Sequence, residues 1–163
     1  MNYAELRRNI VDLIEKYAPA GTKFEWDNAT RRFGSCRYTY NRLTGQYYNF
    51  KITVSYPLAS RNEWEVVKLT VLHEIAHALA PGHNHDAVWR RECIRIGGNG
   101  KRCYTGVEDG GNVNTIPTKW LGVCPACGYS YPRNRRCRQG AYHCDRNRPL
   151  VWKINPAFLK QCA

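Results

Sequence analysis

The sequence contains no run of the roughly eighteen apolar residues that a membrane-spanning helix requires. Its first segment, MNYAELRRNIVDLIEKY, places charged residues among the apolar ones and lacks the continuous apolar core of a secretory signal. We therefore expect an intracellular protein, cytoplasmic or associated with the nucleoid, with no membrane partner.

Acidic residues are nearly lacking in one part of the chain. Residues 117–163 contain nine Lys and Arg but a single acidic residue, a net charge of +8, whereas residues 1–116 contain 16 basic and 12 acidic residues, a net of +4. An excess of positive charge confined to a short segment favours a polyanionic partner, and nucleic acid is the common one. The alternative is a solvated basic face without a partner.

Internal repeats and low-complexity segments are also absent. A chain of 163 residues with 43% hydrophobic residues can form one ordinary domain plus a small appendage. Residues 97–118 are rich in Gly and Asn and are typical of a linker. We predict a domain over 1–116 and a second module over 117–163. Without a secretory signal, the eight cysteines are expected to be reduced rather than paired as disulfides.

The hydrophobic pattern predicts an α+β fold. Apolar residues at helical spacing predict an N-terminal helix over 3–17, and segments 23–27, 33–40 and 46–55 predict a short antiparallel meander with a hairpin near Thr44–Gly45. Ser60 and Glu63 form a capping-box pattern that opens a second long helix, which Pro81–Gly82 ends. A further helix is expected from about 86 to 96.

The second long helix contains the motif H-E-x-x-H, within VLHEIAHALAPGHNHDAVW. Residues four apart share one face of a helix, so His73 and His77 can direct imidazole nitrogens at one metal ion. Glu74 lies beside them and can take a proton from a water on that metal. The motif predicts a catalytic zinc site.

A catalytic zinc needs a third protein ligand, and three residues can supply it. His83 has the metzincin spacing. That pattern, however, requires a glycine at the position of Ala80 and a methionine turn beneath the metal, and Met1 is the only methionine in the sequence. Glu92 has arginine neighbours, which indicates a surface position. His85, just before the next helix, remains.

The stretch LHEIAHAL, followed by a glycine and then H-x-x-x-W, resembles the SprT-like (Spartan-type) zinc metalloproteases. RRFGSCRYTY and YNFKITVSYPL are similar to that family's strands, and the resemblance covers roughly residues 5–155. It implies a zincin-like catalytic domain that hydrolyses peptide bonds of proteins attached to DNA. The implied zinc ligands are His73, His77 and His85, where His85 stands four residues before Trp89, and Glu74 is the implied general base.

The basic module contains Cys124 and Cys127 in C-P-A-C-G, with Cys137 and Cys144 following 10 and 17 residues after Cys127. Such paired thiols predict a small β-rich zinc ribbon that holds a second, structural zinc. SprT-like proteins often have such a ribbon, with C-x-x-C in both halves. Here Asn147 stands at that spacing after Cys144, so Cys137 is the expected fourth ligand and His143 the alternative.

Arginines in this module are interleaved with tyrosines. Guanidinium groups contact phosphates and aromatic rings stack on unpaired bases, which favours a sequence-tolerant contact to DNA, including single strands. The alternative is that the arginines only keep the module soluble. The candidate DNA-binding residues are Arg133, Arg135, Arg136, Arg138, Tyr142 and Arg146.

The sequence thus predicts a zinc-dependent endopeptidase that acts as a monomer on a protein substrate and contacts DNA. The alternative from another class is a non-catalytic nucleic-acid-binding zinc protein with a structural or vestigial H-E-x-x-H site. The presence of Glu74 argues against that alternative, because a structural site does not need a carboxylate beside its ligands.

Overall fold

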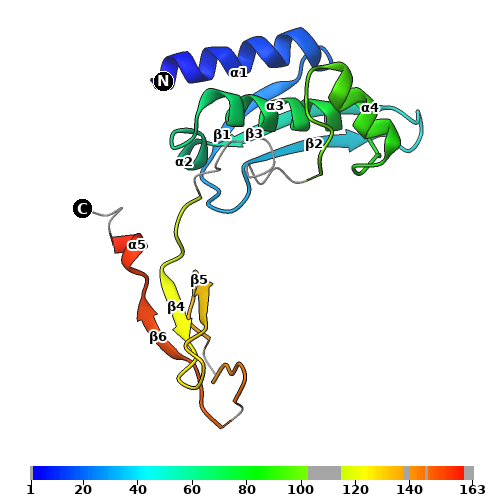
Figure 1. Ribbon diagram of the computed structural model, residues 1–163. Helices are drawn as coiled ribbons and strands as arrows, with labels where there is room; N and C mark the ends of the chain where they lie inside the picture. Colours follow the sequence, from blue (N-terminus) through cyan, green and yellow to red (C-terminus); the bar gives the residue numbers. More distant parts are fainter. Residues whose placement is uncertain (1, 103–114, 138–139, 146, 160–163) are drawn as a thin grey trace. The chain divides into compact units, whose positions relative to one another are not determined.

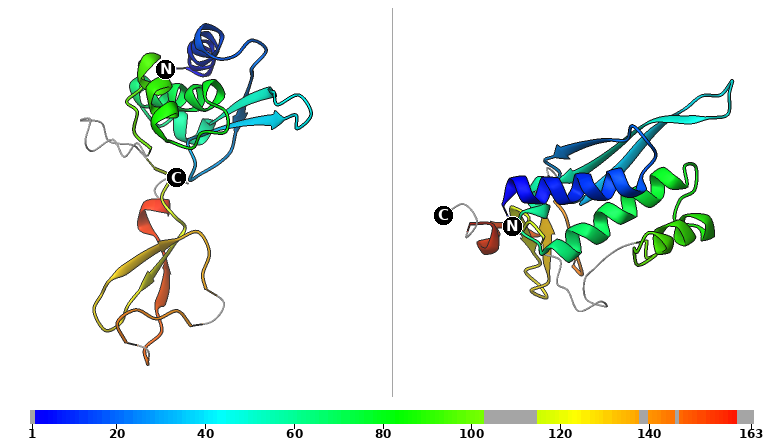
Figure 2. Two further views of the ribbon diagram at one scale, coloured as in Figure 1. Left: turned by 90° about the vertical axis from the view of Figure 1, so that its right-hand side faces the viewer. Right: turned by 90° about the horizontal axis from the view of Figure 1, so that it is seen from above.

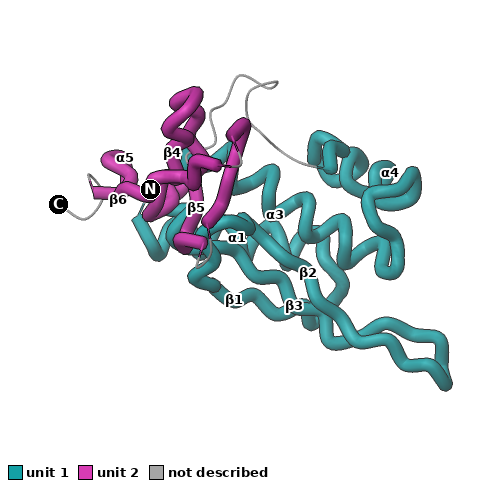
Figure 3. The backbone as a smooth tube through the Cα atoms, turned by 90° about the horizontal axis from the view of Figure 1, so that it is seen from below, with its two compact units in different colours: residues 1–115 teal, residues 116–163 magenta. Residues whose placement is uncertain are grey.

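A computed structural model describes residues 2–102, 115–137, 140–145 and 147–159. The chain divides into two compact units, Met1–Thr115 and Ile116–Ala163 (Figure 3). Within the described ranges, no helix is both long and apolar enough to cross a membrane. The mixed α+β class expected from the sequence is confirmed, with the long helices in the first unit and a small three-stranded sheet in the second.

Helix α1 (Tyr3–Tyr17) begins where the Asn2 side chain accepts the Glu5 N–H at 2.9 Å. Leu6, Ile10 and Ile14 recur every fourth residue, so they share one face, and all three are buried. The helix ends at Ala18, whose backbone is extended. The predicted N-terminal helix is confirmed.

The first sheet has the strand order β1–β3–β2, with β1 (Lys23–Asp27), β2 (Gly34–Tyr40) and β3 (Tyr47–Ser55). Strand β3 pairs antiparallel with β2 and parallel with β1, so the expected antiparallel meander is wrong for β1. The physical reason is burial: Ile52 and Val54 are fully buried, which favours β3 in the centre, while the more polar β1 and β2 take the edges. The hairpin turn at Thr44–Gly45 is confirmed, with Gly45 at φ +70°.

Helix α3 (Trp64–Leu79) forms the centre of the first unit and packs against α1 and β2 (Figure 1). The expected capping box is wrong. Ser60 instead ends a short helix α2 (Tyr56–Ala59), and Glu63 stands at the start of α3 without a side-chain hydrogen bond to the helix. Burial of Val67, Val71 and Ile75 therefore stabilises α3 in place of that cap.

Helix α4 (Ala87–Arg95) begins at Asp86, whose carboxylate accepts the N–H groups of Val88 and Trp89 at 2.9 and 3.0 Å. It ends at Ile96, before Gly97 at φ +92°. The predicted helix from 86 to 96 is confirmed to within a residue at each end.

The second unit contains β4 (Trp120–Val123), β5 (Ser130–Arg133) and β6 (Val151–Ile154), followed by the short helix α5 (Pro156–Leu159). Strand β4 lies in the middle and pairs antiparallel with both neighbours. Gly122 allows Trp152 to pack closely against β4, because a Cβ there would be 2.9 Å from the indole ring. This sheet positions the cysteines at its end.

Candidate active site and a second metal-ligand cluster

Three histidine side chains from two segments of the first unit converge on one point. His73 and His77 are one turn apart on α3, and His85 belongs to the segment between α3 and α4. The Nε2 atom of His85 lies 3.0 Å from that of His73 and 3.1 Å from that of His77. His85 has φ +56°, a left-handed conformation that is uncommon outside glycine and persists only where the surroundings enforce it.

These spacings fit a tetrahedral zinc ion. Imidazole nitrogens at about 2.0–2.1 Å from zinc are about 3.3 Å from one another in a tetrahedron, close to the separations in this site. Three neutral nitrogen donors also leave a fourth position open, as catalytic zinc sites require. The donor set therefore fits the metal that the sequence predicts.

Backbone carbonyls fix the orientation of two of the rings. The Lys101 carbonyl accepts a hydrogen bond from His73, and the His83 carbonyl accepts one from His77. Because the Nε2 atoms face one another, the donors are the Nδ1–H groups, which leaves the Nε2 lone pairs free to bind a metal. Asn99 in turn accepts the Lys101 N–H at 3.1 Å, so its side chain holds that backbone segment.

The electrostatics of the site keep the rings neutral. Burial, together with the neighbouring His77 and His85, lowers the pKa of His73 to about 4. Burial and the neighbouring His85 lower the pKa of His77 to about 4, and burial also lowers the pKa of His85. All three rings are therefore unprotonated at neutral pH, the state in which imidazole binds a metal.

Trp89 forms the floor beneath the three rings. It is fully buried, and its ring centroid lies 4.7 Å from His73, 5.3 Å from His77 and 4.6 Å from His85. His85 and the two histidines of α3 thus all pack against the same ring. His83 lies apart, with its Nδ1 atom 2.7 Å from the carboxylate of Asp86.

Glu74 is buried next to the histidines, at 8% exposure. Burial raises the pKa of its carboxyl to about 7, against the opposing effects of Arg32 and of a hydrogen bond from the Cys36 backbone N–H. A carboxyl with a pKa near neutral can both accept and donate a proton at physiological pH. This is the property that a general base needs.

Strand β2 holds Glu74 from the other side. Gly34 has no side chain, and a Cβ there would lie 2.8 Å from Glu74 Cγ and 3.1 Å from Thr70 Cγ2. The Gly34 and Cys36 backbones together fix the carboxylate. Neither residue could be assigned this role from the sequence, because only the packing of β2 on α3 brings them to Glu74.

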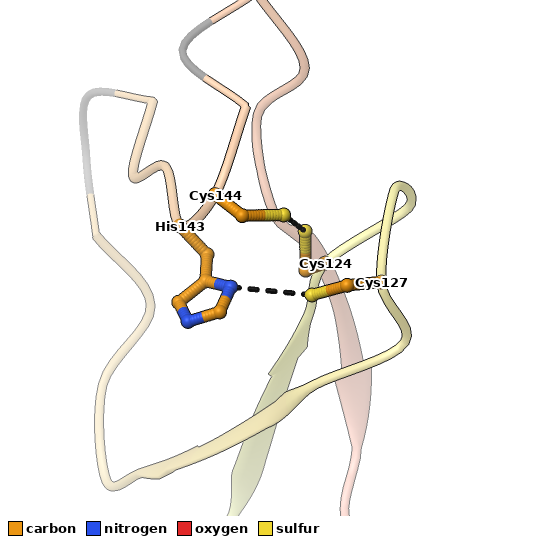
Figure 4. Close-up of side chains that lie close together, drawn as sticks. All are labelled: Cys124, Cys127, His143 and Cys144. Carbon is orange, nitrogen blue, oxygen red and sulfur yellow. Dashed lines mark hydrogen bonds between the residues drawn. The ribbon is translucent and has the colours of Figure 1, made fainter.

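A second cluster lies at the end of the ribbon sheet and contains three cysteines and a histidine (Figure 4). Cys124 Sγ is 3.5 Å from Cys144 Sγ, and Cys127 Sγ is 3.2 Å from His143 Nδ1. A hydrogen bond from the Cys127 backbone N–H, helped by one from Ala126, lowers the pKa of Cys124 to about 6, so the thiolate is favoured. A Cys3His set is a common structural zinc site.

Cys137, the expected fourth ligand, lies outside this cluster, whereas His143, the alternative, lies within it. The reason is the direction of the strands. The turn that contains Cys124 and Cys127 joins β4 to β5, and β5 runs back from it until Arg133 pairs with Trp120 at the far end of β4. The Arg136 guanidinium lies 4.5 Å from the centre of the Trp120 ring, so the chain just before Cys137 is still at that far end.

The DNA-binding candidates are exposed where the structure describes them: Arg133, Arg135, Arg136 and Tyr142. Arg138 and Arg146 lie outside the described residues. Tyr142 is 49% exposed, and the Arg133 guanidinium lies 5.8 Å from the centre of the Tyr131 ring. An exposed guanidinium group and a tyrosine ring therefore lie side by side on this module.

Comparison with known proteins identifies a family for the first unit. The model of the SprT-like family matches residues 4–109, which include all three histidines, Glu74, Trp89 and strand β2, and which stop before the ribbon. No curated protein and no solved structure matches the chain.

Proposed function

Because this chain belongs to the SprT-like family, which is associated with metallopeptidase-like domains, we propose that it is a zinc-dependent endopeptidase acting on DNA-associated proteins. The observation that carries the proposal is the convergence of three imidazole Nε2 atoms beside one buried carboxyl. A binding module has no need of a carboxyl whose pKa burial raises to about 7 next to three neutral histidines.

In this proposal His73, His77 and His85 hold a catalytic zinc ion. When bound, zinc supplies a Lewis acid that polarises the scissile carbonyl and makes a water more acidic. The Lys101 and His83 carbonyls keep the Nε2 lone pairs directed at the ion. Trp89 excludes water from beneath the rings, which strengthens electrostatic interactions in the site.

Glu74 moves the proton. It accepts a proton from the attacking water as that water's oxygen bonds to the carbonyl carbon, and it then donates the proton to the amine nitrogen as the C–N bond breaks. The Cys36 N–H and the Gly34 backbone keep the carboxylate in one position during both transfers. The net reaction is the hydrolysis of one peptide bond.

The second unit is proposed to hold a structural zinc and to tether the enzyme to DNA. The Cys124, Cys127, His143 and Cys144 side chains supply the ligands. The net charge of +8 over residues 117–163 and the exposed arginines support a polyanionic partner. A DNA tether would bring the site to proteins that are attached to DNA.

The test is to incubate the zinc-loaded full chain with a basic protein substrate, with and without single-stranded DNA, beside a Glu74→Gln variant. We expect the wild type to cut and the variant to be slower by about 100-fold or more, because loss of a general base costs that much. Zinc content should be equal in both. No cleavage by the zinc-loaded wild type would leave the non-catalytic nucleic-acid-binding protein as the better description. Equal cleavage by both proteins would contradict the role of Glu74 as general base.

A further inference from the structure

The hairpin of β2 and β3 extends past the helices of the first unit as a pair of antiparallel strands (Figure 2). Residues 28–62, which contain it, include six Lys and Arg and not one Asp or Glu. This is the longest part of the first unit without a negative charge. The charged side chains of the hairpin are therefore all positive.

Aromatic rings form a row along one face of this hairpin. Tyr38 and Tyr47 have ring centroids 5.2 Å apart, and Tyr40 lies across from Tyr47 at 4.8 Å. Phe50 extends the row at 5.8 Å from Tyr38. Tyr40, at the outer end, is 50% exposed, so half of its surface is accessible to a ligand.

The base of the row is fixed to the body of the unit. The Tyr38 hydroxyl accepts the Gly82 N–H at 2.8 Å, and a Cβ at Gly82 would lie 2.7 Å from the Tyr47 hydroxyl. These contacts hold the rings on the turn that follows α3. The row is thus preorganised, which lowers the entropy lost when a ligand binds.

The opposite face and the tip add further exposed groups. Thr39 pairs with Tyr48, so Tyr48 lies on the face opposite Tyr40, and it is 45% exposed. Arg37 and Arg42 are exposed, and neither forms a salt bridge with any part of the chain that the structure describes. Arg32 and Lys51, by contrast, are paired with Asp27 and Glu25.

We propose that the β2–β3 hairpin binds single-stranded nucleic acid, with unpaired bases stacked on Tyr40 and Tyr48 and phosphates on Arg37 and Arg42. Exposed rings interleaved with unpaired cations are the combination that binds single strands without sequence preference. The absence of carboxylates over residues 28–62 makes a polyanion the complementary partner. The bases must be unpaired because, in a duplex, the neighbouring base pairs cover the faces of each base and leave none for a tyrosine to stack on.

This surface belongs to the first unit and requires neither the ribbon nor peptide-bond hydrolysis. The test is therefore fluorescence anisotropy of a labelled 20-nucleotide single strand with the full chain, in which the ribbon is the same for every variant. Proteolysis of a DNA-free protein substrate is measured separately, so failure of the proposed hydrolysis and failure of this binding surface give different results.

Tyr40→Ala should weaken binding of the single strand about tenfold, while Tyr40→Phe, which keeps the ring, should stay within about twofold of wild type. The loss for a duplex of equal length should be smaller. Arg42→Ala should reduce the slope of log affinity against log salt by about 0.7, the value for one phosphate contact on a single strand. Unchanged affinity in Tyr40→Ala, or equal losses for single strand and duplex, would overturn the proposal.

Discussion

The Gly34 backbone lies directly against the Glu74 side chain, and a Cβ at Gly34 would be 2.8 Å from Glu74 Cγ. Gly34 begins the edge strand β2, and the Cys36 N–H two residues later donates to the same carboxylate. The position of the proposed general base therefore depends on a strand that lies well before it in the chain.

Gly34→Ala should lower kcat about 10- to 100-fold, because the added methyl group displaces the Glu74 carboxylate. Zinc content should not change, since the side chains nearest to Gly34 are those of Glu74 and Thr70 and not the histidines. Steady-state cleavage and metal analysis measure the two effects. Thr39→Ala, at an exposed position of the same strand, is the matched control and should behave as wild type. A folded Gly34→Ala protein with wild-type kcat would contradict this role.

His85→Ala should weaken zinc binding more than about 100-fold, because it removes a ligand rather than a supporting group. His83→Ala should bind zinc as wild type does, since His83 faces Asp86 instead of the other histidines. Competition with a chromophoric chelator gives both affinities. If only His83→Ala weakened zinc binding, His83 and not His85 would be the third ligand.

The metal-free protein should become less stable as pH falls from about 6.5 toward 4. His73 and His77 have folded pKa values of about 4, below 6.5, so in this window the unfolded chain binds protons that the folded chain does not. Glu74 acts in the opposite sense. Its folded pKa of about 7 exceeds 4.5, so its contribution is present below pH 4.5 and disappears as pH rises to 7.

Glu74→Gln removes that opposing contribution, so its free energy of unfolding should fall more steeply on acidification than that of wild type. The difference in slope between pH 4.5 and 7 should approach about 1.4 kcal/mol per pH unit, the value for one proton. Urea unfolding of chelator-treated protein, followed by the helix signal of the first unit, measures it. Parallel curves would show that Glu74 titrates normally in the folded protein.

The ribbon should bind its zinc through His143 and not through Cys137. His143→Ala should reduce the zinc content of the full chain from about two ions to one, while Cys137→Ser should leave it at two. Metal analysis after dialysis gives the counts. Loss of an ion from Cys137→Ser, with His143→Ala unaffected, would restore the cysteine as the fourth ligand.

Replacing Arg135, Arg136 and Arg138 with Ala should weaken DNA binding and reduce its salt dependence. The slope of log affinity against log salt should fall by about 0.7 for each single-strand phosphate that the protein no longer neutralises. Anisotropy titrations at several salt concentrations measure the slope. Replacement of the same residues by Lys keeps the charge and serves as the control. Binding that is unchanged in the Ala variant would reject the tether.

The sequence by itself determined the features that depend on neighbouring residues. The spacing of His73, Glu74 and His77 places them on one helix face because a helix repeats every 3.6 residues. The burial of Leu6, Ile10 and Ile14 follows from the same period. The family resemblance added His85, whose register relative to Trp89 the structure explains through their ring contact.

Only the tertiary structure decided which distant segments meet. Three contacts join residues across loops or strands: the parallel pairing of β1 with β3, the contact of Gly34 with Glu74, and the approach of His143 to the three clustered cysteines. Local propensity cannot select among such pairings, because the free energy that selects them comes from burying apolar side chains between whole elements. The histidines that share one helix face could therefore be identified from the sequence, and the residues that position them could not.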